Sequence, residues 1–194
     1  MKSVLTTAAV LTILTLGGCG GSGGDTGKSG SSTTPRENVT YQGSIALWDY
    51  LVPAGDTTNQ YIKTTGDQVQ KYRTRFVRAN NSVTETSEIA PGEKTVYTNR
   101  DNTIKIDFFT DNTPNGTVEM KARVDIGDIV TVKKSDCRLA RQLATFAYDG
   151  RKYQDVIEID CGNQPGYYQK GVGEIMQQKK LTTNGTKVTK VLTK

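Results

Sequence analysis

The stretch Val69-Gln70-Lys71-Tyr72-Arg73-Thr74-Arg75-Phe76-Val77 carries a positive charge at every second position through its middle. Successive side chains of a β-strand point to opposite faces of the sheet, so a period of two is typical of a strand with one solvated face. Lys71, Arg73 and Arg75 would form that outer face, where their charge discourages pairing with another chain. The stretch therefore predicts a strand of a β fold.

The same alternation continues on both sides of this strand, interrupted by residues that favour tight turns. Strands are expected between Tyr61 and Ser87 and in six further segments: Lys94–Thr98, Thr103–Phe109, Thr117–Val124, Ile129–Lys133, Met176–Thr183 and Thr186–Thr193. The expected turns are Thr65–Asp67, Asn80–Ser82, Ala90–Gly92, Arg100–Asn102, Asp111–Gly116, Ile126–Asp128 and Asn184–Gly185. This pattern predicts a mainly β fold with little helix: a single curved antiparallel sheet or half-barrel meander of roughly 9 to 11 strands.

The segment Ser44–Val52 is strongly apolar and carries the chain's single tryptophan, Trp48. Its alternation predicts a strand that buries the larger side chains on one face, namely Ala46, Trp48, Tyr50 and Val52. We interpret Trp48 as a core anchor, with stacking on a ligand as the alternative. The one segment with tempting helical spacing is Arg138–Phe146, but it is short and has no polar cap beyond Asp136.

The N-terminus has the features of a cleaved secretory signal. Lys2 precedes an apolar run from Val4 to Leu16 that is too short to span a bilayer. The run ends in Leu16-Gly17-Gly18-Cys19, which resembles the lipobox of bacterial lipoproteins. The alternatives are a cysteine that follows an ordinary signal peptide by coincidence, or one in a buried apolar strand. We expect residues 1–18 to be a lipoprotein signal peptide.

The lipobox resemblance implies that Cys19 begins the mature chain and carries a diacylglycerol thioether and an acylated amine, with acyl groups such as palmitate. Stable anchoring needs more than one acyl chain, which a triacylated cysteine supplies. Gly20 stands where an aspartate would resemble an inner-membrane retention signal, so we expect the outer membrane, with the body in the periplasm or on the cell surface. Residues 19–38 are expected to be the lipidated Cys19 and a flexible Gly/Ser tether, and residues 39–194 a single β domain.

With Cys19 assigned to lipid, Cys137 and Cys161 remain. Disulfides persist outside the cytoplasm, so an even pair there predicts one bridge. It would close a loop of about 25 residues and contribute roughly 3 to 3.5 kcal/mol. The alternatives are a metal site, which would lack further thiol or imidazole ligands, and a redox pair, which usually has closer spacing.

The composition excludes several classes of site. The chain has no histidine, which removes Ser-His-Asp and Cys-His nucleophilic sites and the usual zinc ligand sets. The formal net charge is only +5, with acidic residues interspersed among the basic ones. So mild a balance argues against a nucleic-acid-binding surface. We expect no nucleic-acid partner, no metal and no cofactor.

A second resemblance lies near the C-terminus. The run from Tyr148 to Ile157, which contains Tyr153-Gln154-Asp155-Val156-Ile157, is followed by Cys161 and then by Tyr167-Tyr168-Gln169-Lys170-Gly171-Val172-Gly173. These segments resemble the C-terminal part of uncharacterised bacterial envelope lipoproteins. The resemblance implies a curved antiparallel sheet of the half-barrel type, the architecture also used by periplasmic lipoprotein carriers, and it implies no catalytic residues. The chain departs from that pattern at Glu174-Ile175, where the resemblance implies a more apolar continuation.

Two motifs invite a chemical interpretation. Asp111–Gly116 has oxygen ligands at alternate positions and a glycine sixth, like the start of an EF-hand loop, but Ala122 stands where a bidentate glutamate is needed. A hairpin turn accounts better for it. Glu158 and Asp160 would lie about 7 Å apart on one strand face, a distance at which paired carboxylates can serve inverting glycoside hydrolysis. The apolar residues occupy the opposite face, so we expect both carboxylates to be solvated rather than catalytic.

Three hypotheses for the function remain. The first is a non-catalytic binding or structural module of the cell envelope that contacts the membrane through Cys19 and engages either an envelope protein or an apolar ligand. The second is a carrier of lipid or another apolar ligand in a half-barrel cavity; its candidate lining residues are Trp48, Phe76, Ile106, Phe108 and Ile157. The third is a hydrolase of envelope polymers that uses Asp and Glu alone. We favour the first and expect the chain not to be an enzyme.

Overall fold

The computed structural model describes residues 36–40, 43–180 and 186–193. The expected signal peptide, Cys19, the greater part of the tether and the expected turn at Asn184-Gly185 lie outside the described residues. The described residues all belong to one unit, residues 31–194.

The described part of the chain is almost entirely β-strand, which confirms the predicted fold class. Its single helix, α1, is one short turn at Trp48–Leu51, and no helix there is long and apolar enough to cross a membrane. The strands are β1 (Arg36–Thr40), β2 (Ile45–Ala46), β3 (Thr57–Thr65), β4 (Gln68–Ala79), β5 (Ser82–Ser87), β6 (Glu93–Arg100), β7 (Thr103–Thr110), β8 (Thr113–Lys121), β9 (Arg123–Val124), β10 (Ile129–Val132), β11 (Ser135–Tyr148), β12 (Arg151–Asp160), β13 (Pro165–Gln169), β14 (Gly173–Lys180) and β15 (Thr186–Leu192).

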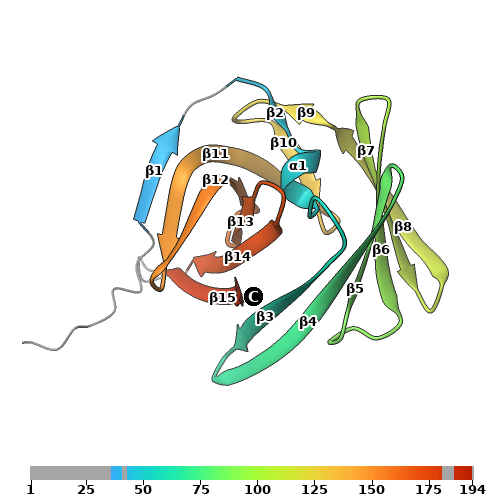
Figure 1. Cartoon of the computed structure of the whole chain (residues 1–194), viewed down its shortest axis with the longest axis horizontal. Coiled ribbons are helices and arrows are strands. Elements are labelled where there is room, and N and C mark those ends of the chain that lie inside the picture. The colour runs from blue at the N-terminus through green and yellow to red at the C-terminus, as the bar shows by residue number, and fades with distance from the viewer. Residues whose placement is uncertain (1–35, 41–42, 181–185, 194) are drawn as a thin grey trace, which may run out of the picture. The chain divides into compact units, whose positions relative to one another are not determined.

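Thirteen of these strands form one antiparallel sheet in the order β1-β11-β12-β13-β14-β15-β3-β4-β5-β6-β7-β8, with β10 also paired to β11. The sheet has more strands than the 9 to 11 that the sequence suggests. It consists of two meanders, β3 to β8 and β11 to β15, joined where β15 pairs with β3. The sheet curves until β8 approaches β10, so it is nearly closed (Figure 1). At this seam the Nζ of Lys134 donates a hydrogen bond to the backbone oxygen of Asn115 at 2.6 Å.

The predicted alternation is confirmed in β4. Tyr72, Thr74 and Phe76 are buried, whereas the charged residues between them are exposed. Arg78, near the end of the strand, behaves differently: it is half-buried and its guanidinium lies 5.6 Å from the centroid of the Trp48 ring. The basic outer face is therefore a solvated face over most of its length.

Two-residue turns connect several neighbouring strands. Tight hairpins favour positive φ at both central residues, and Asn and Asp tolerate this conformation best among non-glycine residues. Four hairpins among the described residues have this geometry, at Asp101-Asn102, Asp111-Asn112, Lys133-Lys134 and Asp149-Gly150. The turn expected over Asp111–Gly116 is thus confined to its first two residues, because the chain re-enters the sheet as β8 at Thr113. The third hairpin was not expected, since lysine is unusual in this conformation.

The strand expected over Ser44–Val52 is wrong. The chain pairs with β9 only at β2 and then turns into α1, where the amide of Leu51 donates to the oxygen of Leu47 at 3.1 Å. Leu47, Tyr50 and Leu51 have the three- and four-residue spacing of one helical face and all three are buried. Trp48 consequently points away from the centre of the core and is only partly buried.

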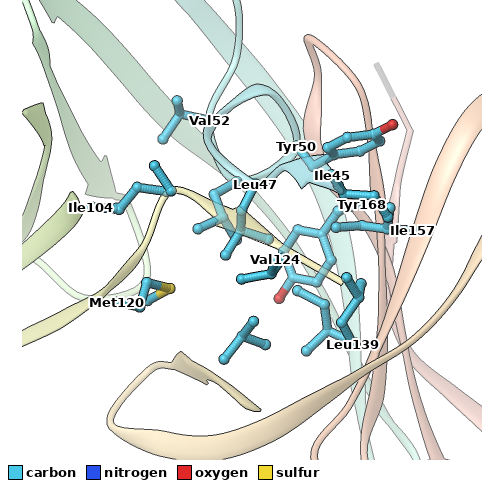
Figure 2. Packing of buried hydrophobic residues seen from close by; sticks show 14 of the residues in the cluster. Ile45, Leu47, Tyr50, Val52, Ile104, Met120, Val124, Leu139, Ile157 and Tyr168 are labelled. Atoms are coloured by element: carbon cyan, nitrogen blue, oxygen red, sulfur yellow. The ribbon is translucent and has the colours of Figure 1, made fainter. Parts of the chain in front are cut away.

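The segment around α1 acts as a plug inside the sheet. We call residues 45–52 together with 122–124 the plug, because their apolar side chains contact both halves of the fold. In Figure 2, Leu47 and Val124 lie between Ile104 and Met120 on one side and Leu139, Ile157 and Tyr168 on the other. The plug fills part of the space that the curved sheet encloses and thereby ties the two meanders together.

The glycine-rich turn after β13 packs against the plug. The amide of Gly171 donates to the oxygen of Asp49 at 2.7 Å, and the amide of Ala54 donates to the oxygen of Gly171 at 2.9 Å. Gly173 has a φ of +91°, and a side chain there would lie 3.6 Å from the oxygen of Leu51. That distance is an ordinary contact, so glycine is favoured here by the backbone conformation rather than by lack of space.

Both faces of β12 are buried over Val156, Ile157, Glu158 and Ile159, which corrects the expectation that one face is solvated there. On one face, Ile157 and Ile159 pack in the hydrophobic cluster around the plug. On the other face, Val156 packs in a second hydrophobic cluster with Phe146 and Tyr167. The rings of Phe146 and Tyr167 lie 4.5 Å apart and nearly parallel. The strong curvature of β11 to β14 brings the side chains of the second face together, so Val156 and Glu158 are buried as well.

Two other segments differ in detail from the expectation. Arg138–Phe146 is a strand, not a helix: it lies within β11, which pairs with β12 on one side and with β1 and β10 on the other. Pairing along both edges outweighs the weak helical spacing. The strand expected over Thr117–Val124 is divided into β8 and β9.

Cys137 and Cys161 form the predicted disulfide, across a sequence separation of 24 residues. Cys137 is near the start of β11 and Cys161 directly follows β12, so the bridge joins the ends of two paired strands. Both residues belong to or pack against the hydrophobic cluster around the plug, which we call the plug core.

Candidate functional site

A cavity of about 430 Å³ lies beside the plug, within the curve of the sheet. Its volume is in the range of sites that hold small molecules. We call it the aromatic cavity, because its lining includes Leu51, Tyr61, Phe76, Tyr97, Ile106, Phe108, Phe109, Val132 and Tyr168. Charged residues also line it, among them Glu85, Glu93, Lys94 and Lys134. Most of these residues stand on strands β4, β6, β7 and β13. The plug therefore occupies one part of the space that the sheet encloses, and the aromatic cavity occupies another part.

The strand register explains why these side chains gather. Thr95 on β6 lies opposite Glu85 on β5 and Phe108 on β7, and Tyr97 lies opposite Val83 and Ile106. Directly opposed residues of antiparallel strands share a face. All of these except Val83 line the cavity, so alternate residues of β5, β6 and β7 point inward.

An ion cluster lies at one side of the aromatic cavity. It consists of Glu174 on β14, Lys190 on β15 and Lys133 in the β10–β11 turn. The Oε2 of Glu174 lies 2.7 Å from the Nζ of Lys190 and 3.2 Å from the Nζ of Lys133. Lys190 also lies 4.0 Å from the centroid of the Tyr61 ring, a cation–π distance. One carboxylate oxygen is thus shared by two ammonium groups.

The ion cluster stays charged across the physiological pH range. Burial alone would raise the pKa of Glu174, but Lys133 and Lys190 together outweigh burial and lower the pKa to about 2. Burial would lower the pKa of Lys190, but the Glu174 carboxylate, with the nearby tyrosines, raises it above its usual value. Glu174 and Lys190 are therefore fixed charges rather than a proton donor and acceptor.

Buried tyrosines surround the cluster and the cavity. Burial raises the pKa of Tyr61, Tyr97 and Tyr168, and a carboxylate adds to the effect at Tyr97, whose hydroxyl donates to Glu85 at 2.7 Å. The hydroxyl of Tyr61 donates to the backbone oxygen of Glu174 at 3.0 Å. These phenols stay neutral, so they provide polar groups in the wall without adding charge.

A second cavity of about 660 Å³ has a different character. We call it the lysine cavity, because five lysines line it: Lys63, Lys133, Lys179, Lys187 and Lys190. The rest of its lining is largely threonine, serine and glutamine, with Tyr72 and Ile89 as apolar members.

Three of the five residues proposed for an apolar cavity line the aromatic cavity: Phe76, Ile106 and Phe108. Ile157 does not, because it is fully buried in the plug core. Trp48 does not either: with Arg78 it lines a separate surface hollow of about 400 Å³, together with Asn80, Asn81, Asn99, Arg100 and Asp101.

The two carboxylates considered for hydrolysis, those of Glu158 and Asp160, form separate ion pairs. Glu158, expected to be solvated, is buried and pairs with Arg141 at 2.6 Å. Asp160 pairs with Lys180 at 2.7 Å and is partly exposed. Each carboxylate has its own cation, so neither is set up to act with the other as an acid and base pair.

The residues of the C-terminal resemblance have structural roles in this chain. Asp155, which has a φ of +51°, accepts hydrogen bonds from the Tyr50 hydroxyl at 2.6 Å and from the Gln142 amide at 3.0 Å. It therefore attaches β12 to α1 and to β11. Among the described residues no group of three or more Cys, Asp and Glu is placed to hold a metal ion.

Sequence reasoning missed Glu174, Lys133 and Lys190 as members of one site. The sequence offered one signal for this site: Glu174 stands at a position where an apolar residue was expected.

A comparison with protein-family models, with curated proteins and with solved structures found no match for this chain.

Proposed function

We propose that this chain is a lipid-anchored binding protein of the bacterial cell envelope, whose curved sheet holds a small apolar molecule in the aromatic cavity. The observation that carries the proposal is the cavity itself. A cavity of about 430 Å³ stands beside the packed plug, and this volume lies in the range of ligand sites. Its wall offers a ligand both aromatic and aliphatic side chains and polar groups.

The plug supports this proposal because it fixes the walls of the cavity. Leu51 belongs both to the plug and to the cavity lining, and Phe76, Ile106 and Tyr168 each contact the plug core as well. Walls held by such packing lose little freedom when a ligand binds, which favours affinity.

The test is a titration of the purified protein with N-phenyl-1-naphthylamine, an apolar dye that fluoresces in apolar surroundings. We expect Thr95→Trp to abolish the signal, because Thr95 lines the cavity and a large ring there would fill it. Thr98→Trp is the matched control: it makes the same change on the same strand but on the opposite face. Equal binding by both variants and the wild type would contradict the proposal.

The anchor is the second part of the proposal, and it is supported by the lipobox resemblance at Cys19. A Cys19→Ala variant expressed in a bacterium should leave the membrane fraction, because the lipid supplies the membrane affinity. A variant that lacks Cys137 and Cys161 instead should stay with the membrane. Membrane retention of Cys19→Ala would refute the anchor and leave the cavity proposal untouched.

A further inference from the structure

The aromatic cavity and the lysine cavity adjoin, because they share five lining residues: Glu85, Ser87, Ala90, Lys133 and Lys190. The aromatic cavity combines a wall of aromatic and aliphatic side chains with charged residues of both signs, whereas the lysine cavity is lined mainly by lysine, threonine and glutamine. The ion cluster lies where the two meet. Together they form one elongated site with an apolar part and a cationic part.

The cationic part has more positive than negative charge. Glu85 is the one carboxylate among the described residues that line the lysine cavity, and it accepts the hydrogen bond of Tyr97. Glu174 offsets part of the charge of Lys133 and Lys190. The other three lysines, Lys63, Lys179 and Lys187, form no ion pair with any described residue. A cavity lined by one sign of charge attracts the opposite sign.

The ion cluster also has an acceptor left over. Glu174 is nine-tenths buried and lines the aromatic cavity, and its Oε1 has no hydrogen-bond partner among the described residues. Buried polar atoms are nearly always hydrogen-bonded, so this oxygen is an acceptor for a hydroxyl group of a ligand, such as a glycerol hydroxyl beside the head, and not for the anionic head itself. A ligand that passes from one cavity to the other would bring its polar end to this point.

We propose that the ligand is an amphipathic anion, a single-chain lipid whose acyl chain lies in the aromatic cavity and whose carboxylate or phosphate head lies in the lysine cavity. This inference rests on the proposed function and adds the class of ligand to it. The acyl chain contacts Phe76, Ile106 and Phe108. The head contacts Lys63, Lys179 and Lys187, which are exposed and reach it without breaking an existing ion pair.

The test compares three lipids with the same acyl chain: palmitate, palmitoyl-lysophosphatidylglycerol and the neutral monopalmitoylglycerol. The measurement is the displacement of N-phenyl-1-naphthylamine from the purified protein by each lipid, at concentrations below the critical micelle concentration of that lipid. The first variant, Lys63→Gln with Lys179→Gln and Lys187→Gln, removes three charges from the lysine cavity. The matched control, Lys71→Gln with Lys121→Gln and Lys152→Gln, removes three exposed charges that do not line either cavity.

We expect at least one anionic lipid to bind more tightly than the neutral lipid, and the cavity variant to weaken that lipid about tenfold. The control variant should bind as the wild type does, and added salt should weaken the anion alone. Whether the carboxylate or the phosphate binds better identifies the head group. Equal binding of neutral and anionic lipids, or equal effects of the two triple variants, would overturn the inference while the proposed function stands. If neither the dye nor any of the three lipids binds, both this inference and the proposed function are overturned.

Discussion

Lys190 and Glu174 form an ion pair inside the fold, with the Nζ and Oε2 atoms 2.7 Å apart and the side chains only 12% and 10% exposed. They stand on the neighbouring strands β15 and β14, and β15 joins the two meanders of the sheet by pairing with β3. Removing two charges from water costs free energy that their attraction offsets only with good geometry. The pair lies where the two cavities meet, which places it within the proposed ligand site.

Replacing Glu174 alone should destabilise the protein more than replacing both partners. Glu174→Met leaves Lys190 buried without its carboxylate, for which we expect a loss of about 3 to 5 kcal/mol in the free energy of unfolding. Glu174→Met combined with Lys190→Met should lose less, because no uncompensated charge remains. Urea unfolding of the two variants measures both values. A double variant that is less stable than Glu174→Met would show that the pair itself, not the isolated charge, dominates.

Acid should remove the contribution of Glu174 to stability. Its pKa is about 2 in the folded protein, against 4.5 for a solvated glutamate. Between these values the unfolded chain binds more protons than the folded one, so the stabilisation is complete above about pH 4.5 and is lost as the pH falls towards about 2. Unfolding free energies of wild type and Glu174→Gln, compared from about pH 6 to about pH 3, measure this. The difference between the two proteins should shrink as the pH falls; a constant difference would argue against the assigned pKa.

Loss of the disulfide should lower stability without abolishing the fold. The bridge between Cys137 and Cys161 closes a loop whose constraint on the unfolded chain is worth about 3 kcal/mol. Cys137→Ala combined with Cys161→Ala should therefore unfold at a lower urea concentration than the wild type. Adding a reductant should shift the wild type to the same midpoint and leave the variant unchanged. A reductant that shifts both proteins alike would mean that the change has another cause.

The sequence could predict the sheet because strand alternation and turn residues are local signals. The burial of Tyr72, Thr74 and Phe76 on β4 follows from the period of two. The disulfide could also be predicted, since only two cysteines remained once Cys19 was set aside. In contrast, α1 could not be foreseen, because an apolar run as short as Ser44–Val52 fits a strand and a buried helical turn equally well.

The site could be predicted only in part. Phe76, Ile106 and Phe108 were identified because large apolar residues on a half-buried strand face either a core or a cavity. The ion cluster depends on pairing between segments far apart in the chain, which brings Lys133 to Glu174 across 41 residues. The curvature that buries Glu158 and leaves the aromatic cavity open is likewise a property of the whole sheet, and no local pattern encodes it.

The central claim is that a small apolar molecule occupies the aromatic cavity, and a crystal structure of the protein with a bromine-labelled fatty acid tests it most directly. The account predicts an anomalous peak for a bromine at the chain terminus between Phe76, Ile106 and Phe108, and it predicts no such peak in Thr95→Trp. A bromine found only in the surface hollow beside Trp48, or side chains that close the cavity in the wild-type crystal, would contradict it.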